Sequence, residues 1–298
     1  MELSLDRLTK QYGRKAVDCV SATLKPGVYG LLGSNGAGKT TLMRMLCAVL
    51  ESTSGEVLLD GKEVTSMGAD YRNVLGYLPQ DFGYYPNYTA VEFLMYIAAL
   101  KGIPKNVAKK RVTELLEVVD LSHVANKKVK TFSGGMKQRV GIAQALLNNP
   151  KILILDEPKV IILDEPTAGL DPKERVRFRN LLSEYAGDKI VILSTHIVSD
   201  IEAIADEVLL MKKGKFVLQG TVPELIHKAN GKVWELSVSP QEARQWQTKT
   251  TVANLRHEGK EIILRIISDN MPSERAVPCE ATLEDLYLFY FPTEEGVK

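Results

Sequence analysis

The sequence predicts an α/β fold with a mostly parallel β-sheet, and three observations lead to this class. An apolar strand (28–32) runs into a glycine-rich loop and then a helix (40–49). Further apolar strands alternate with helical segments along the chain. A block of about 60 residues with helical spacing (89–149) interrupts that alternation. Alternating strands and helices favour a parallel sheet whose two faces are covered by helices.

The remaining elements follow in order. Leu3, Leu5 and Leu8 indicate an edge strand, and short strands are expected at 56–60 and 74–78. After the helical block, strands are predicted at 160–163, 190–193, 208–211 and 216–218. From about residue 221 the pattern changes to short alternating strands (233–238, 255–257, 262–267) and a final amphipathic segment, LEDLYLFYF. We therefore predict a main domain over 1–220, with a helical subdomain at about 81–150, and a small α+β appendage over 221–298.

Composition limits the possible functions. The chain has 298 residues, 45% of them hydrophobic, with 38 Lys+Arg against 37 Asp+Glu. A net charge of +1 gives no basic surface of the kind that binds nucleic acid. Three scattered cysteines fit a reducing compartment better than a disulfide framework. No apolar run reaches the roughly 20 residues that span a bilayer, so any role at a membrane would need a partner.

The glycine-rich loop carries the first chemical motif. It matches the phosphate-binding pattern G-x(4)-G-K-[ST], placed after a strand and before a helix as that pattern requires. Glycines let backbone N–H groups approach phosphate oxygens, while the lysine and the hydroxyl supply a cation and a Mg²⁺ ligand. The predicted nucleotide-binding residues are Gly33, Ser34, Asn35, Gly36, Ala37, Gly38, Lys39, Thr40 and Thr41.

A second motif narrows the family. The segment FSGGMKQR, with Ser133, Gly134 and Gly135 at its centre, precedes a helix, and an apolar strand ending in Asp-Glu-Pro follows. Here the sequence resembles the ATP-binding cassette (ABC) ATPases, whose signature reads LSGGQ; Phe132 and Met136 depart from it. The resemblance covers about residues 1–220 and implies a RecA-like core around a helical subdomain. The segment TLEDL (282–286) is similar to the end of a C-terminal extension in bacterial drug, antibiotic and peptide exporter subunits.

The resemblance assigns roles to further residues. Tyr12 would stack on adenine, and Gln80 would contact Mg²⁺ or the attacking water. AGLDP (168–172) matches the D-loop, and His196 matches the switch histidine at the γ-phosphate. In this family the phosphate loop of one cassette faces the SGG of another across ATP. The chain is therefore expected to bind ATP and Mg²⁺ and to pair with a second cassette.

One segment occurs twice. Residues 151–158 read KILILDEP and residues 159–166 read KVIILDEP, with six of eight positions identical. The family needs this strand once, with its Asp near Mg²⁺ and its Glu as general base. We predict that the second copy is the strand, with Asp164 as metal ligand and Glu165 as base, because it runs directly into the D-loop. The first copy would then be an insertion in a loop, where insertions are tolerated best.

The resulting hypothesis is an ATP-hydrolysing subunit at the cytoplasmic face of the membrane, which energises transport, more often export, through a separate permease. The aromatic segment, Asp81–Tyr88 (DFGYYPNY), would dock that permease, although its tyrosines could also simply pack the helical subdomain. Two rival classes are a soluble ABC ATPase of translation or DNA repair and a nucleotide-binding regulator without catalysis. The first usually has two fused cassettes or a long coiled coil, and this chain has neither. The cargo is not encoded here.

Overall fold

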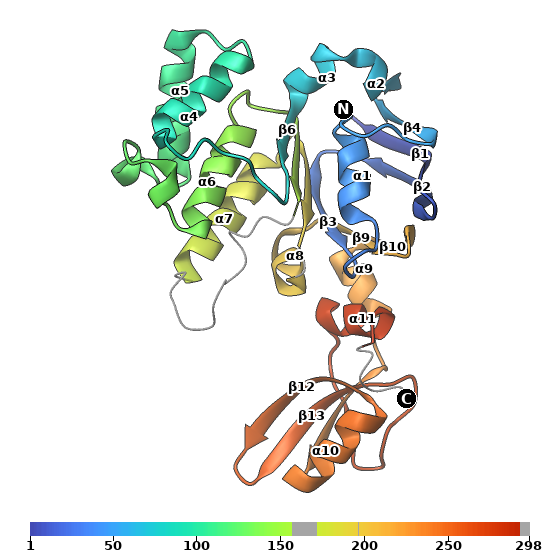
Figure 1. Ribbon diagram of the computed structural model, residues 1–298. Helices are drawn as coiled ribbons and strands as arrows, with labels where there is room; N and C mark the ends of the chain where they lie inside the picture. The colour runs from blue at the N-terminus through green and yellow to red at the C-terminus, as the bar shows by residue number, and fades with distance from the viewer. Residues whose placement is uncertain (157–171, 196, 293–298) are drawn as a thin grey trace. The chain divides into compact units, whose positions relative to one another are not determined.

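The computed structural model describes residues 1–156, 172–195 and 197–292. The chain divides into two units, Met1–Val217 and Leu218–Lys298 (Figure 1). The sequence predicted a boundary at 220/221. The first unit has two sheets and the second has one, and each unit has its own buried cluster of apolar side chains.

The first unit contains a six-stranded sheet in the order β10-β9-β3-β8-β7-β6. Its strands are β3 (Gly27–Leu32), β6 (Leu75–Leu78), β7 (Ile152–Asp156), β8 (Ile190–Ser194), β9 (Glu207–Lys212) and β10 (Lys215–Thr221). The pairs β3–β8, β3–β9, β6–β7 and β7–β8 are all parallel. The mostly parallel α/β fold is confirmed.

Strand β7 is formed by the first copy of the duplicated segment. Ile152 pairs with Leu75 on one side and with Ile190 on the other, and the register continues to Leu155. All four apolar residues of β7 are fully buried, as expected for a strand covered on both faces. The prediction that this copy is a loop insertion is therefore wrong. The second copy, with the strand predicted at 160–163, lies outside the described residues.

A second, antiparallel sheet has the order β2-β1-β4-β5. Its strands are β1 (Leu3–Gln11), β2 (Lys15–Leu24), β4 (Ser54–Leu59) and β5 (Lys62–Glu63). Strand β1 pairs with β2 on one side and β4 on the other, so the prediction of an edge strand at Leu3–Leu8 is wrong. Its second neighbour is about 50 residues away in sequence, and an apolar alternation cannot reveal whether such a partner exists.

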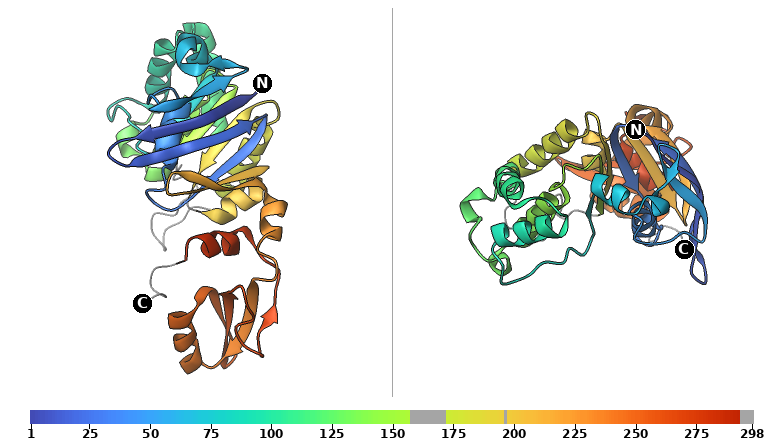
Figure 2. Two further views of the ribbon diagram at one scale, coloured as in Figure 1. Left: turned by 90° about the vertical axis from the view of Figure 1, so that its right-hand side faces the viewer. Right: turned by 90° about the horizontal axis from the view of Figure 1, so that it is seen from above.

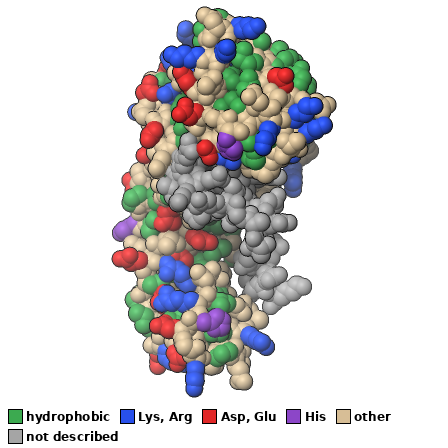
Figure 3. Space-filling view, turned by 90° about the vertical axis from the view of Figure 1, so that its left-hand side faces the viewer, with side chains coloured by type: hydrophobic (Ala, Val, Ile, Leu, Met, Phe, Trp, Pro, Cys, Tyr) green, Lys and Arg blue, Asp and Glu red, His purple; other side chains and the backbone are tan. Residues whose placement is uncertain are grey.

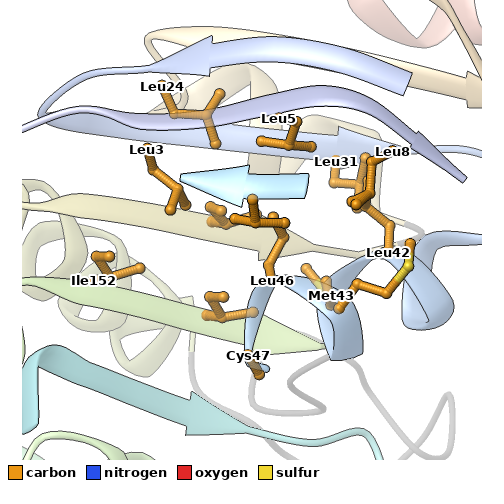
Figure 4. Close-up of a cluster of buried hydrophobic side chains, with 14 of the residues drawn as sticks. Leu3, Leu5, Leu8, Leu24, Leu31, Leu42, Met43, Leu46, Cys47 and Ile152 are labelled. Atoms are coloured by element: carbon orange, nitrogen blue, oxygen red, sulfur yellow. The ribbon is translucent and has the colours of Figure 1, made fainter. Parts of the chain in front are cut away.

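Helix α1 (Lys39–Leu46) joins the two sheets through one core. Leu42, Met43 and Leu46 of α1 lie among buried side chains from both sheets, as Figure 4 shows. Ile152 and Ile154 of β7 belong to this cluster, whereas the alternate residues Leu153 and Leu155 face the other side of the sheet. Two short helices, α2 (Val64–Met67) and α3 (Ala69–Val74), lead from the antiparallel sheet to β6.

The predicted helical insert forms three main helices, α4 (Ala90–Leu100), α5 (Lys105–Val118) and α6 (Gly134–Ala145). They gather at one side of the sheets (Figures 1 and 2). Helix α4 begins with a capping box, in which Thr89 accepts from Glu92 N and Glu92 accepts from Thr89 N. Two 3₁₀ turns, Ser122–Val124 and Val129–Thr131, connect α5 to α6.

Helices α7 (Pro172–Tyr185) and α8 (Val198–Ile204) complete the first unit. Helix α8 packs closely on β3. A Cβ on Gly30 of β3 would come within 2.3 Å of Ile201 Cγ2 in α8, so only glycine allows this approach. Arg179 of α7 forms an ion pair with Asp200 of α8, whose side chain is fully buried. The two helices are thus attached to each other and to the sheet.

The second unit has an antiparallel sheet in the order β12-β13-β11-β14. Its elements are α9 (Val222–His227), β11 (Val233–Val238), α10 (Pro240–Lys249), β12 (Thr251–Glu258), β13 (Glu261–Ile267), β14 (Val277–Pro278) and α11 (Leu283–Tyr290). Arg265 of β13 pairs with Asp285 of α11 at 2.6 Å. Across the parts of the chain that the structure describes, no helix combines the length and apolar character needed to cross a membrane.

The position of β7 predicts unequal effects of matched substitutions in the two copies. Leu153→Ala should lower the free energy of unfolding by about 2–5 kcal/mol, because it empties space in a close-packed interior. Ile161 is the equivalent residue of the second copy, and Ile161→Ala should cost much less because only one copy can lie between β6 and β8. Urea unfolding followed by circular dichroism measures both. A larger loss for Ile161→Ala would contradict the assignment of β7.

Candidate functional site

The phosphate-binding loop, residues 33–38, is fixed by close backbone contacts. Gly38 has φ +107°, and a Cβ there would come within 2.2 Å of the Ala16 carbonyl oxygen in β2. A Cβ on Gly33 would lie 2.3 Å from the carbonyl oxygen of Met211 in β9. Ala37 O also accepts a hydrogen bond from Gly214 N at 2.9 Å. Glycine is therefore required at both ends of the loop, and the loop is held between β2 and β9.

Lys39 begins α1 and is almost fully buried, with 6% of its surface exposed. Its Nζ donates to Gly33 O at 2.7 Å and to Ser34 O at 3.3 Å. Ser34, Asn35 and Gly36 at the tip of the loop are exposed. This arrangement directs a cation and a helix N-terminus toward one accessible surface, which suits an anionic ligand such as a nucleotide phosphate.

Asp156 lies at the end of β7 beside the phosphate loop. Its side chain is fully buried, and Thr40 Oγ1 is 3.4 Å from its Oδ1. A hydroxyl and a carboxylate are oxygen ligands that suit Mg²⁺. The sequence predicted Asp164 at this strand end, and the structure corrects that prediction, since β7 ends in Asp156. Asp164 and Glu165 themselves lie outside the described residues.

Two other ionisable groups near Asp156 are neutral at physiological pH. Burial raises the pKa of the Cys47 thiol well above its usual range, and the charge of Asp156 adds to that shift. Burial also raises the pKa of Tyr77 to about 12, with smaller contributions from Cys47 and Asp156. Neither group therefore supplies a negative charge beside Asp156.

The parallel register gathers the other predicted residues at one edge of the sheet. Leu78 pairs with Leu155, Asp156 with Ser194, and Leu31 with Ser194. The chain leaving β6 reaches Gln80, and the chain leaving β3 enters the phosphate loop, both at the carboxyl ends of their strands. This edge is where doubly wound α/β sheets bind ligands. His196, two residues after β8, lies outside the described residues.

Tyr12 projects from the turn between β1 and β2. Its side chain is 55% exposed, and Lys10 Nζ lies 5.4 Å from the centre of its ring. The same hairpin contacts the phosphate loop through Ala16. An accessible aromatic ring attached to that loop provides a surface on which a base could stack.

The signature motif stands at the start of α6. Ser133 is the N-cap, and its Oγ accepts from Met136 N at 3.2 Å. Ser133 and Gly134 are exposed, and a Cβ on Gly134 would meet no atom within 4 Å. Phe132, which replaces the family's leucine, is 4% exposed and anchors the motif in the helical part. The N-terminus of α6 is therefore held by the buried Phe132 side chain, while Ser133 and Gly134 stay accessible.

The aromatic segment continues into a larger cluster that the sequence did not reveal. Its rings contact Phe93 and Tyr96 of α4, with centroid separations between 5.3 and 6.3 Å. Tyr85 is 48% and Tyr88 is 38% exposed. The tyrosines thus both pack the helical part and present a surface. Phe93 and Tyr96 were part of a helical pattern, which gives no sign of rings arriving from another segment.

Comparisons with known proteins agree with this geometry. A family model described as "ABC transporter" matches residues 17–160 and so includes the whole first copy of the duplicated segment. An uncharacterized ABC transporter ATP-binding protein of Bacillus subtilis, YxlF, is 34% identical over 96% of this chain and 98% of its own length. The chain belongs to the ABC transporter ATP-binding proteins.

This ABC ATP-binding chain is also similar to a resistance protein and to a cassette of known structure. The linearmycin resistance ATP-binding protein LnrL of Bacillus subtilis is 34% identical over 80% of this chain and 75% of its own length. A solved post-hydrolysis dimer of the cassette MJ0796, bound to ADP and Pi, has a TM-score of 0.64 and 26% identity, covering 74% of this chain and 98% of that one. This chain is an ATP-binding, ATP-hydrolysing subunit of the ABC class.

The phosphate loop generates a direct binding prediction. Lys39→Ala should weaken ATP binding by at least about a hundredfold, because the phosphates lose a buried cation that makes charge-assisted hydrogen bonds. Isothermal titration of the purified chain with ATP measures the affinity. Lys62→Ala, at an exposed position of β5, is the control and should bind like the wild type. Wild-type affinity for Lys39→Ala would overturn the assignment of the loop.

Proposed function

We propose that this chain energises export through a separate membrane permease, as one of two identical cassettes at the cytoplasmic face of the membrane. The observation that carries the proposal is the contact between Asp156 at the end of β7 and Thr40 of the phosphate loop. The contact brings the N-terminus of α1, which can bind phosphate, next to Asp156, a carboxylate that can bind a metal ion. The similarity to a resistance ATP-binding protein supports export rather than uptake.

Mg²⁺ would be held at this edge by oxygen atoms of Thr40 and Asp156, with Gln80 at the adjoining strand end. The donor set fits that ion, because hard cations prefer hydroxyl, carboxylate and amide oxygens. When bound, Mg²⁺ would neutralise charge on the β- and γ-phosphates. Lys39 holds the same phosphates through its ammonium group, and Tyr12 stacks on the adenine.

The choice of Asp156 as the Mg²⁺ ligand also determines which glutamate is the candidate general base. Because Asp156 ends β7, we propose Glu157, the next residue, as the base that takes a proton from the attacking water. Glu165, predicted from its continuity with the D-loop, is the competing candidate. Both glutamates lie outside the described residues. His196 would stabilise the charge that develops on the γ-phosphate.

A second copy of the chain would complete the site. Ser133 and Gly134 are exposed, Gly135 is half-buried, and a Cβ on Gly134 would meet no described atom within 4 Å. An open helix N-terminus of this kind can receive the γ-phosphate of nucleotide held by another cassette. The solved dimer of MJ0796 supports the pairing. ATP would join the two cassettes, and hydrolysis would release them.

The permease would dock on the helical part. Figure 3 shows hydrophobic side chains gathered on the upper part of the molecule, which the helical part forms. The exposed rings of Tyr85 and Tyr88 belong to the aromatic segment predicted to receive the permease. Amphipathic rings are well suited to such contacts, since they bury a large area with few rotatable bonds.

Substitution of the two glutamates distinguishes the candidate bases. Glu157→Gln should abolish hydrolysis while preserving ATP binding, and should therefore accumulate an ATP-bound dimer. Glu165→Gln should hydrolyse ATP and remain largely monomeric. Size-exclusion chromatography with ATP and Mg²⁺ reads out the dimer in both variants. A dimer that accumulates only with Glu165→Gln would transfer the role of base to the second copy.

Substitution of the exposed rings tests the docking surface. Tyr85→Ala combined with Tyr88→Ala should reduce recovery of the chain with the membrane fraction of its host by about tenfold or more, as expected for loss of two interface anchors. ATP affinity of the purified variant should stay unchanged. Val49→Ala, at an apolar position that is 68% exposed and lies just after α1, is the control. Unchanged membrane recovery of the double variant would rule out this surface.

A further inference from the structure

Two rings of the aromatic segment lie against the helix that carries the signature motif. Lys137 Nζ of α6 lies 5.2 Å from the centre of the Tyr84 ring, a cation–π distance. A Cβ on Gly141 would come within 2.6 Å of Leu78 Cδ1 and 3.2 Å of Phe82 ring atoms. Residues four apart share a helix face. One face of α6 therefore receives both rings.

Gly141 is a buried residue inside α6. Glycine inside a helix is unfavourable relative to alanine because it adds conformational freedom to the unfolded chain. Here its missing side chain allows Leu78 and Phe82 to approach α6 closely. The close approach places the Lys137 end of the same face under Tyr84. The helix and the aromatic segment are thus packed directly against each other.

The rings also connect α6 to the exposed surface. Phe82 contacts Tyr84 at 6.3 Å and Phe93 at 5.8 Å, measured between ring centroids. Phe93 contacts Tyr85, and Tyr85 contacts Tyr88. A displacement at Tyr85 or Tyr88 would therefore reach Lys137 through side chains in direct contact. A coupling energy measured between residues along such a path tests whether it transmits a displacement.

We propose that Lys137, held on the Tyr84 ring, is a positioning residue for hydrolysis: with the Gly141–Phe82 contact it sets where Ser133-Gly134-Gly135 stands. The inference rests on the proposed function, in which that turn meets the nucleotide of a second cassette. Lys137 lies one turn from Ser133 on the same helix. Loss of the stack would leave α6 folded and the phosphate loop intact but would change the alignment of the signature turn.

The test is a double-mutant cycle on the full chain. Lys137→Gln and Tyr84→Leu should each lower kcat for ATP by about 3- to 10-fold, the range expected for one cation–π pair. The KM for ATP should change less than twofold, since the phosphate loop is untouched. Lys137→Gln with Tyr84→Leu together should be no worse than either single change. Effects that multiply in the double variant would overturn the proposal.

Conservative variants separate positioning from general damage. Lys137→Arg should keep kcat within twofold of the wild type, because a guanidinium also stacks on an aromatic ring. Tyr84→Phe should do the same, because the ring remains. Lys232→Gln is the matched control, since Lys232 Nζ lies 4.1 Å from the Phe289 ring in the second unit; it should leave kcat unchanged. Failure of Lys137→Arg to restore activity would contradict the cation–π role.

The outcomes also distinguish this inference from the proposed function. If the wild type hydrolyses ATP and dimerises with it, while Lys137→Gln has wild-type kcat, only the positioning role fails. If the wild type neither hydrolyses ATP nor dimerises with it, the proposed function fails. Gly141→Ala gives an independent reading, with reduced kcat and unchanged ATP affinity expected. Its circular dichroism spectrum must match that of the wild type, and wild-type kcat would count against the role of this helix face.

Discussion

The contact between Asp156 and Thr40 is the interaction on which the site depends, and it exists because β7 lies between β6 and β8 in a parallel sheet. Parallel strands end at the same edge, so the register that buries Ile152–Leu155 also carries Asp156 to the phosphate loop. The loop is held in turn by backbone contacts that only glycine allows at Gly33 and Gly38. The same strand pairing therefore buries the apolar residues of β7 and places the Asp156 carboxylate at the phosphate loop.

The two chemical halves of this cassette are built in different ways. The phosphate loop is clamped between β2 and β9, whereas the signature turn stands at the open end of α6, whose side face packs on aromatic rings. A rigid loop suits tight binding of nucleotide. The signature turn stands at the end of a helix whose side packs on aromatic rings, and these rings extend to the surface. This arrangement suits a turn whose position changes when a permease binds that surface. Contact between the permease and the helical part would then change the position of the signature turn and so the rate of ATP hydrolysis.

The phosphate loop, the signature and the parallel sheet could be predicted because each is marked by residues close together in sequence. The choice between the two LDEP copies could not, because both carry the same apolar pattern and the same Asp-Glu-Pro. Continuity with the D-loop favoured the second copy, but the pairing of Ile152–Leu155 with β6 and β8 decides for the first. The interior place of β1 and the stack of Lys137 on Tyr84 were also missed. Both depend on partners about 50 residues away, which no local pattern reports.

The most direct measurement is the Mg²⁺-dependent ATPase rate of two matched variants, Asp156→Asn and Asp164→Asn. Each removes one carboxylate charge at the same position of its copy while keeping the side chain nearly the same size. The account predicts that Asp156→Asn loses several kcal/mol of transition-state stabilisation, about a thousandfold in rate, whereas Asp164→Asn hydrolyses ATP close to the wild-type rate. A wild-type rate for Asp156→Asn with a collapse for Asp164→Asn would contradict it.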